Sequence, residues 1–140
     1  MRRARKQSIL PAILLTAGLF GLVHVGNFIS GADPFQTLIQ VVDSACAGVL
    51  LGALYLLTGN LLVPIAAHVL QDVVFLSISG FTNDSGLVTR GVSAADFIAL
   101  IPALLMCGFV LWFLSRERSR ETALRIWTKK WNGVFPELPL

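Results

Sequence analysis

Basic residues are almost absent from the whole middle of this chain. Between residues 7 and 115 the only lysine or arginine is Arg90, while the other ten lie in the first six residues or after Leu114. Only 14% of the 140 residues are charged and 55% are hydrophobic, whereas an average soluble domain is about 25% charged. A soluble fold would not leave its centre so bare, so the sequence predicts an integral membrane protein.

Four apolar segments are long enough to cross a bilayer, which takes about 20 residues of helix. They cover residues 8–28, 35–57, 60–79 and 94–114, and stretches of turn-forming residues separate them. The fold class we expect is all-α: a polytopic membrane helix bundle with about four transmembrane helices, surrounded by the lipid bilayer.

The distribution of basic residues predicts the topology. An even number of crossings puts both basic ends on one side of the membrane, and the positive-inside rule assigns that side to the cytoplasm. We therefore expect both termini to lie in the cytoplasm. The net charge of +3 belongs to these ends, so it gives no reason to expect nucleic-acid binding.

The chain divides into a transmembrane domain, residues 1–114, and a basic amphipathic tail, residues 115–140. In the tail, Ala123, Trp127 and Trp131 recur every four residues among basic side chains. This spacing is typical of a helix that lies in the membrane interface, although a frayed basic tail fits the pattern as well.

Segment 35–57 carries two different helical faces. Ser44, Gly48 and Gly52 form a stripe of small residues, which lets two membrane helices approach closely. A neighbouring face carries polar residues, namely Gln36, Gln40 and Asp43. Because a carboxyl group facing lipid is costly, we expect this face to look inward, either toward a polar site or toward a packing partner in another helix.

Each of two histidines at bilayer depth has partners one helical turn away. Phe20 precedes His24 by four residues and Asn27 follows it by three, while Asp72 follows His68 by four. A carboxylate so placed can hold one ring nitrogen and leave the other directed into a cavity. We expect one polar pocket among the first three segments, containing both histidines, Asp72 and Asp43; a simple interhelical hydrogen bond is the alternative for either histidine.

Two stretches of this sequence resemble a known family. "LFGLVHVGN" and "GVLLGALYLLTGNLLVPIAAHVLQDVV" are similar to the CPBP group, which comprises CAAX-type prenyl proteases and related Abi-type bacterial intramembrane proteases. Phe20 and His24 match the family's Phe-x-x-x-His motif, and His68 and Asp72 match its His-x-x-x-Asn/Asp motif. The resemblance covers about residues 2–80 and implies an integral protein of the bacterial inner membrane.

The resemblance implies a hydrolase, an intramembrane endopeptidase or metalloprotease, acting on a membrane-associated peptide or a prenylated protein. His24, His68 and Asp72 would be the catalytic residues, and His24 and His68 the candidate zinc ligands. The supporting residues would be Phe20, Asn27 and Asp43.

One motif of the family is missing. The family has a Glu-Glu-x-x-x-Arg helix before the first histidine motif, whereas the only glutamates here are Glu117, Glu121 and Glu137. The chain is therefore expected to begin just after that helix, as a fragment, a mis-assigned start or a truncated relative, with impaired activity. Asp43, the only other deep carboxylate besides Asp72, is a candidate replacement base.

The sequence is also compatible with two other functions. A non-catalytic binding or immunity-type protein could use the same scaffold. A small ion-coupled transporter subunit could use His24, Asp43 and Asp72 as a proton relay, but the sequence has no internal repeat of the kind such transporters show. Cys46 and Cys107 lie in apolar stretches and are expected to be small buried residues, without a basis for a disulfide.

Overall fold

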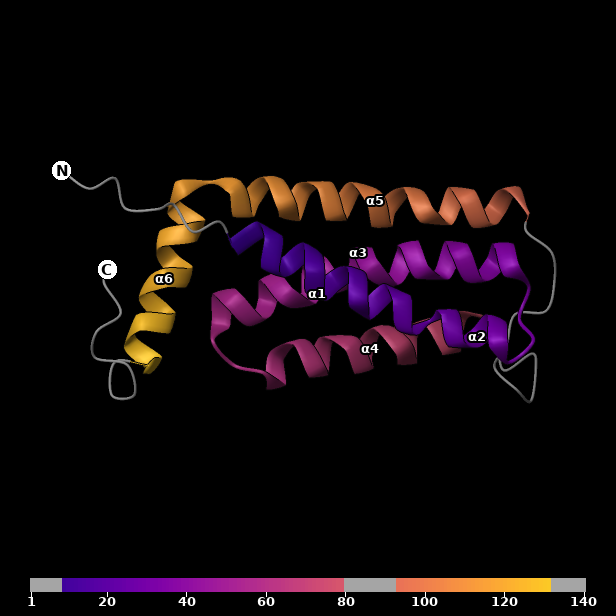
Figure 1. Cartoon of the computed structure of the whole chain (residues 1–140), viewed down its shortest axis with the longest axis horizontal. Helices are drawn as coiled ribbons and strands as arrows, with labels where there is room; N and C mark the ends of the chain where they lie inside the picture. Colours follow the sequence, from indigo (N-terminus) through magenta and orange to yellow (C-terminus); the bar gives the residue numbers. More distant parts are fainter. Residues whose placement is uncertain (1–8, 80–92, 132–140) are drawn as a thin grey trace.

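The computed structural model describes residues 9–79 and 93–131, and these residues form helices joined by short turns. The all-α prediction is confirmed. In Figure 1, α3 and α5 run side by side, α1 crosses α3, and α6 lies across one end of the bundle. The helices are α1 (Ile9–Val23), α2 (Val25–Ile29), α3 (Pro34–Thr58), α4 (Leu62–Ser79), α5 (Ala94–Ser115) and α6 (Glu117–Trp131).

Three stretches of the described residues are long and apolar enough to cross a membrane: Ile9–Ile29, Pro34–Thr58 and Asp96–Ser115. The fourth predicted segment is also helical, but by length and composition α4 contains only a shorter apolar helix, Leu62–Val74. The start of α1, the end of α3, the start of α4 and the end of α5 gather at one end of the bundle (Figure 1). This arrangement suits four crossings, while the crossing by α4 and the cytoplasmic side remain predictions.

The central helix is α3, which contacts α1, α2, α4, α5 and α6. Its start is well defined, because the Asp33 side chain accepts hydrogen bonds from the backbone N–H groups of Phe35 and Gln36. Its end is marked by Gly59, whose φ of +63° favours glycine. The buried apolar core joins α1, α3 and α5 and consists of Ile13, Ala17, Val49, Ala53, Val110 and Leu114.

Glycines allow α1 and α3 to pack closely. A Cβ atom at Gly21 would lie 2.5 Å from the Val41 carbonyl oxygen, and one at Gly48 would lie 2.9 Å from the Ala17 Cα. At Gly52 the nearest atoms would be 3.7 Å away on the Ile13 side chain, an ordinary contact. The predicted role of the small-residue stripe is confirmed at Gly48, whereas Gly21 is a packing position that the stripe did not include.

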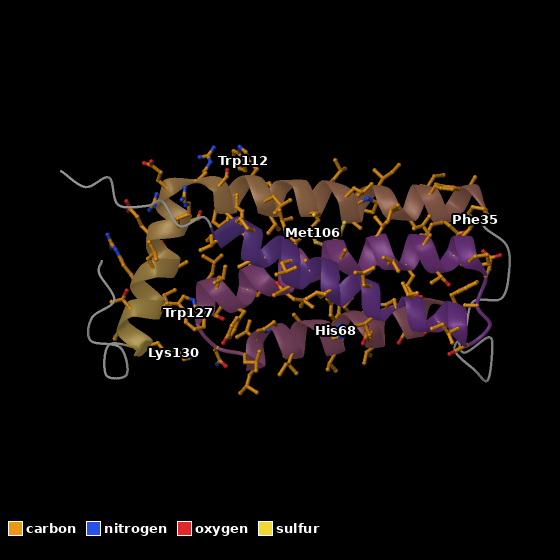
Figure 2. All side chains as sticks on the ribbon, in the orientation of Figure 1. Phe35, His68, Met106, Trp112, Trp127 and Lys130 are labelled. Atoms are coloured by element: carbon orange, nitrogen blue, oxygen red, sulfur yellow. The ribbon has the colours of Figure 1, made fainter. Side chains whose placement is uncertain are left out.

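Helix α6 docks on the end of α3. Trp127 Nε1 donates to the Leu56 carbonyl at 3.0 Å, and Lys130 Nζ donates to the Gly59 carbonyl. Leu56 is in the last turn of α3 and Gly59 is its C-cap residue, so neither carbonyl has a partner within the helix. Figure 2 shows both side chains at the end of the bundle that α6 crosses. The tail therefore forms the predicted helix as far as Trp131, and part of its apolar face lies against protein.

Candidate functional site

His24 interrupts the first membrane segment. The backbone N–H of His24 donates to the Gly21 carbonyl at 3.0 Å, three residues back rather than four, and the chain restarts as α2 at Val25. The expected segment 8–28 is thus a single span built from two helices. The Phe20 carbonyl, which a regular helix would pair with the His24 N–H, instead lies 3.1 Å from the His24 Nδ1 atom.

This contact decides which ring nitrogen of His24 carries the proton. A carbonyl oxygen only accepts hydrogen bonds, so Nδ1 must be the donor. In the neutral ring, Nε2 is then left with a free lone pair. His24 therefore presents a hydrogen-bond acceptor or metal ligand at Nε2, held in place by its own helix.

His68 lies on α4 and has a different environment. Its Nδ1 atom is buried and has no hydrogen-bond partner in the described part of the chain. Asp72 Oδ1 lies 3.6 Å away, one turn along the helix, which is slightly too long for a hydrogen bond. The Asp72 side chain is 58% exposed, so a small rotation can bring its carboxylate to Nδ1. That movement would fix the ring and leave Nε2 of His68 free.

Phe20 joins the two histidines. The centroid of its ring lies 5.6 Å from that of His24 and 5.3 Å from that of His68, with interplanar angles of 71° and 79°. Both are edge contacts of the kind that aromatic rings prefer. Figure 2 places His68 partway along α4, in the middle part of the bundle. One ring on α1 therefore brings together histidines from two motifs 44 positions apart in the sequence.

The other expected site residues are distributed around this pair. Asp43 is half-buried on α3 and interacts electrostatically with His24. Asn27 Nδ2 donates to Gln40 Oε1 at 2.8 Å and so ties α2 to α3. Spacing within one helix placed Gln40 on the same face as Asp43. It could not show that Gln40 bonds to Asn27, because Asn27 lies on another helix.

The described residues do not complete a metal site. Over residues 9–79 and 93–131, no group of three or more histidine, cysteine, aspartate or glutamate side chains could hold a metal ion. Catalytic zinc usually takes three protein ligands and structural zinc four. The two imidazoles would supply two, so zinc at His24 and His68 stays a prediction.

Comparison with known proteins identifies the family. Residues 1–74 match the family model described as type II CAAX prenyl endopeptidase Rce1-like, and this match covers more than half of the chain. The chain belongs to the Rce1-like family. No curated protein and no solved structure matches it.

The Rce1-like match agrees with the resemblance seen in the sequence. It includes Phe20, His24, His68 and Asp72, and it extends from before α1 into α4. The expectation of a CAAX-protease relative over about residues 2–80 is therefore confirmed. The individual roles of the site residues remain predictions.

Proposed function

We propose that the chain is an intramembrane endopeptidase of the CAAX type with impaired activity, acting on a prenylated or otherwise membrane-associated peptide. One observation carries this proposal: two histidines from separate helices contact the same Phe20 ring within a chain of the Rce1-like family. These two histidines would form the part of the site that binds the substrate and polarises its scissile carbonyl.

Peptide hydrolysis makes two demands on such a site. A water molecule must lose a proton as it attacks the scissile carbonyl carbon, and the oxyanion that forms must be stabilised until the C–N bond breaks. The proton then passes to the leaving amine. A competent site therefore needs a proton acceptor near the water and a hydrogen-bond donor or cation near the carbonyl oxygen.

Each histidine can contribute to one of these demands: His24 can position the water, and His68 can stabilise the oxyanion. Neutral His24 has a lone pair at Nε2, which can accept a hydrogen bond from a water molecule and so hold it in place. His68 can be oriented by Asp72 at Nδ1 and, when protonated, donates from Nε2 to a developing oxyanion. Both imidazole rings contact the Phe20 ring, which limits how far they can move apart.

The general base of the family motif has no counterpart in this sequence. The three glutamates all follow α5, and two of them, Glu117 and Glu121, lie on α6. A general base contributes roughly 10²- to 10⁴-fold to a rate. Asp43 interacts electrostatically with His24 and is the candidate replacement for this base. It lies on α3, whereas the two histidine motifs lie at α1 and on α4.

We therefore predict that the purified 140-residue chain cleaves a farnesylated CAAX peptide no faster than background, with or without added zinc. The measurement is mass spectrometry of the peptide after incubation with the chain in liposomes. Rapid cleavage that His24→Ala abolishes would contradict the impairment. Loss of that cleavage in Asp43→Asn would then identify Asp43 as the base.

Binding tests the rest of the proposal. A farnesylated peptide with a photoreactive group should crosslink to the chain, and His24→Ala and His68→Ala should reduce the crosslinked fraction several-fold. Ser77→Ala is a matched control, because Ser77 is exposed on α4 and donates only to the Val73 carbonyl of its own helix. Equal crosslinking of the unprenylated peptide, or no effect of either histidine variant, would contradict a CAAX-type substrate site.

A non-catalytic binding protein on the same scaffold is the second candidate. The observation that favours it is the two-imidazole donor set, to which the described residues add no third metal ligand. Fusing a helix with a Glu-Glu-x-x-x-Arg motif to the N-terminus separates the two functions. Cleavage that appears with this fusion and depends on His24 supports the endopeptidase, whereas binding without cleavage supports the second candidate.

A further inference from the structure

A cavity lies at the junction of α5 and α6, and neither histidine lines it. Arg116 is extended between the two helices, with φ of −71° and ψ of 139°. The cavity at this junction has a volume of about 560 Å³. Its lining residues are Leu57, Trp112, Phe113, Arg116, Arg118, Ser119 and Thr122.

The wall of this cavity has two chemically distinct parts. Leu57, Trp112 and Phe113 belong to the candidate membrane spans α3 and α5 and form an apolar part. The polar part consists of two arginines and two hydroxyl residues from the junction and α6. The residues described around the cavity include no carboxylate, so the two guanidinium groups give it a positive charge.

The arginines and hydroxyls are arranged to leave donors available. The Arg116 guanidinium lies 4.0 Å from the centre of the Trp112 ring, a cation–π contact that holds its face and leaves its N–H edges available. Thr122 uses its hydroxyl proton on the Arg118 carbonyl at 2.9 Å. The donors toward a ligand are therefore the two guanidinium groups and the hydroxyl of Ser119, a residue only 5% exposed.

We propose that this cavity binds the phosphate of an anionic phospholipid, with Arg116 and Arg118 on the phosphate and an acyl chain along Trp112 and Phe113. Guanidinium groups match phosphate geometry through paired N–H donors. A lipid, rather than free phosphate, suits the apolar wall and the position at the end of a membrane span.

The rest of α6 supports a membrane partner at this site. Residues 116–131 carry six basic and two acidic side chains. Basic groups next to a bilayer are attracted to its anionic lipids. Because Trp127 and Lys130 dock α6 on α3, the polar wall of the cavity is held at a fixed distance from the apolar one.

The experiment uses the full chain in a neutral detergent. Phosphatidylglycerol, phosphatidylcholine and inorganic phosphate are titrated separately, and native mass spectrometry and thermal unfolding report binding and Tm. Phosphatidylglycerol should remain bound and raise Tm, while the other two should do neither at the same concentration. Arg116→Gln and Arg118→Gln should each weaken phosphatidylglycerol binding roughly tenfold.

Arg125→Gln is the matched control, because it removes the same charge from an exposed position on α6 outside the cavity. Equal weakening by Arg125→Gln, or equal retention of phosphatidylcholine, would overturn the proposal in favour of non-specific adsorption. A rise in Tm with inorganic phosphate alone would show a simple anion site and overturn the lipid assignment. Arg118→Gln keeps the test valid if Arg116→Gln fails to fold, because Arg118 is exposed.

Discussion

At the scale of single residues, Phe20 contacts His24 through its backbone carbonyl and connects the two histidine motifs through its ring. The spacing of Phe20 and His24 identified a motif, and the structure shows that the Phe20 carbonyl holds Nδ1 while the Phe20 ring contacts both histidines. Spacing along one helix cannot reveal such a contact, because His68 reaches Phe20 from another helix. Nor could it show that the helix is interrupted at His24.

Phe20 gives a stability prediction at this scale. Phe20→Ala removes both histidine contacts and the packing near Gly48, and should lower the free energy of unfolding in detergent by about 2 kcal/mol, because the ring is only half-buried. The control is Leu19→Ala, at a position that is 56% exposed. Denaturant unfolding followed by circular dichroism measures both, and equal losses would show that Phe20 has no special packing role.

At the scale of the helices, hydropathy and turn residues predicted the segments to within a few residues. The break between α1 and α2 was not predicted, since residues 8–28 read as one continuous apolar stretch. The close contact of α1 with α3 was predicted only in part. Gly48 belonged to a visible stripe of small residues, but Gly21 is a single glycine whose importance depends on the Val41 carbonyl of the opposing helix.

The glycines provide a matched set of variants. Gly21→Ala and Gly48→Ala place a methyl group against backbone atoms of the neighbouring helix, so each should destabilise the chain by about 1–3 kcal/mol. Gly52→Ala adds the same methyl group at an ordinary contact distance and should change stability little. Thermal unfolding in detergent compares the three. A loss at Gly52 as large as at Gly48 would contradict the described α1–α3 packing.

At the scale of the whole molecule, the sequence motifs accounted for the first part of the chain only. The family match ends at residue 74, and neither α5 nor α6 carries a motif. Their positions depend on long-range contacts that a single sequence does not display. Two such contacts are the hydrogen bond from Trp127 to Leu56 and the proximity of the Cys46 and Cys107 thiols on α3 and α5.

The two cysteines test the position of α5. The sequence alone gave no basis for a disulfide, but the adjacent thiols should be joined by mild oxidation in membranes, because a small side-chain rotation brings two such sulfurs together. Arg90 is the only tryptic site between Lys6 and Arg116, so trypsin separates the two cysteines unless they are linked. Mass spectrometry should find a reducible linked peptide pair that Cys107→Ser abolishes, and unlinked peptides after oxidation would contradict the proximity of the two thiols.

The central claim is that His24 and His68 contribute to one site around Phe20. In a chain with both native cysteines replaced by alanine, His24→Cys and His68→Cys should be crosslinked by a short bis-maleimide in membranes, because both rings contact the same phenyl ring. His24→Cys with Leu62→Cys is the control, since Leu62 is at the start of α4, about 9 Å before His68 along the helix axis. The first pair should be crosslinked and the second only weakly. A first pair that stays uncrosslinked, or is crosslinked no better than the control, would contradict a shared site around Phe20.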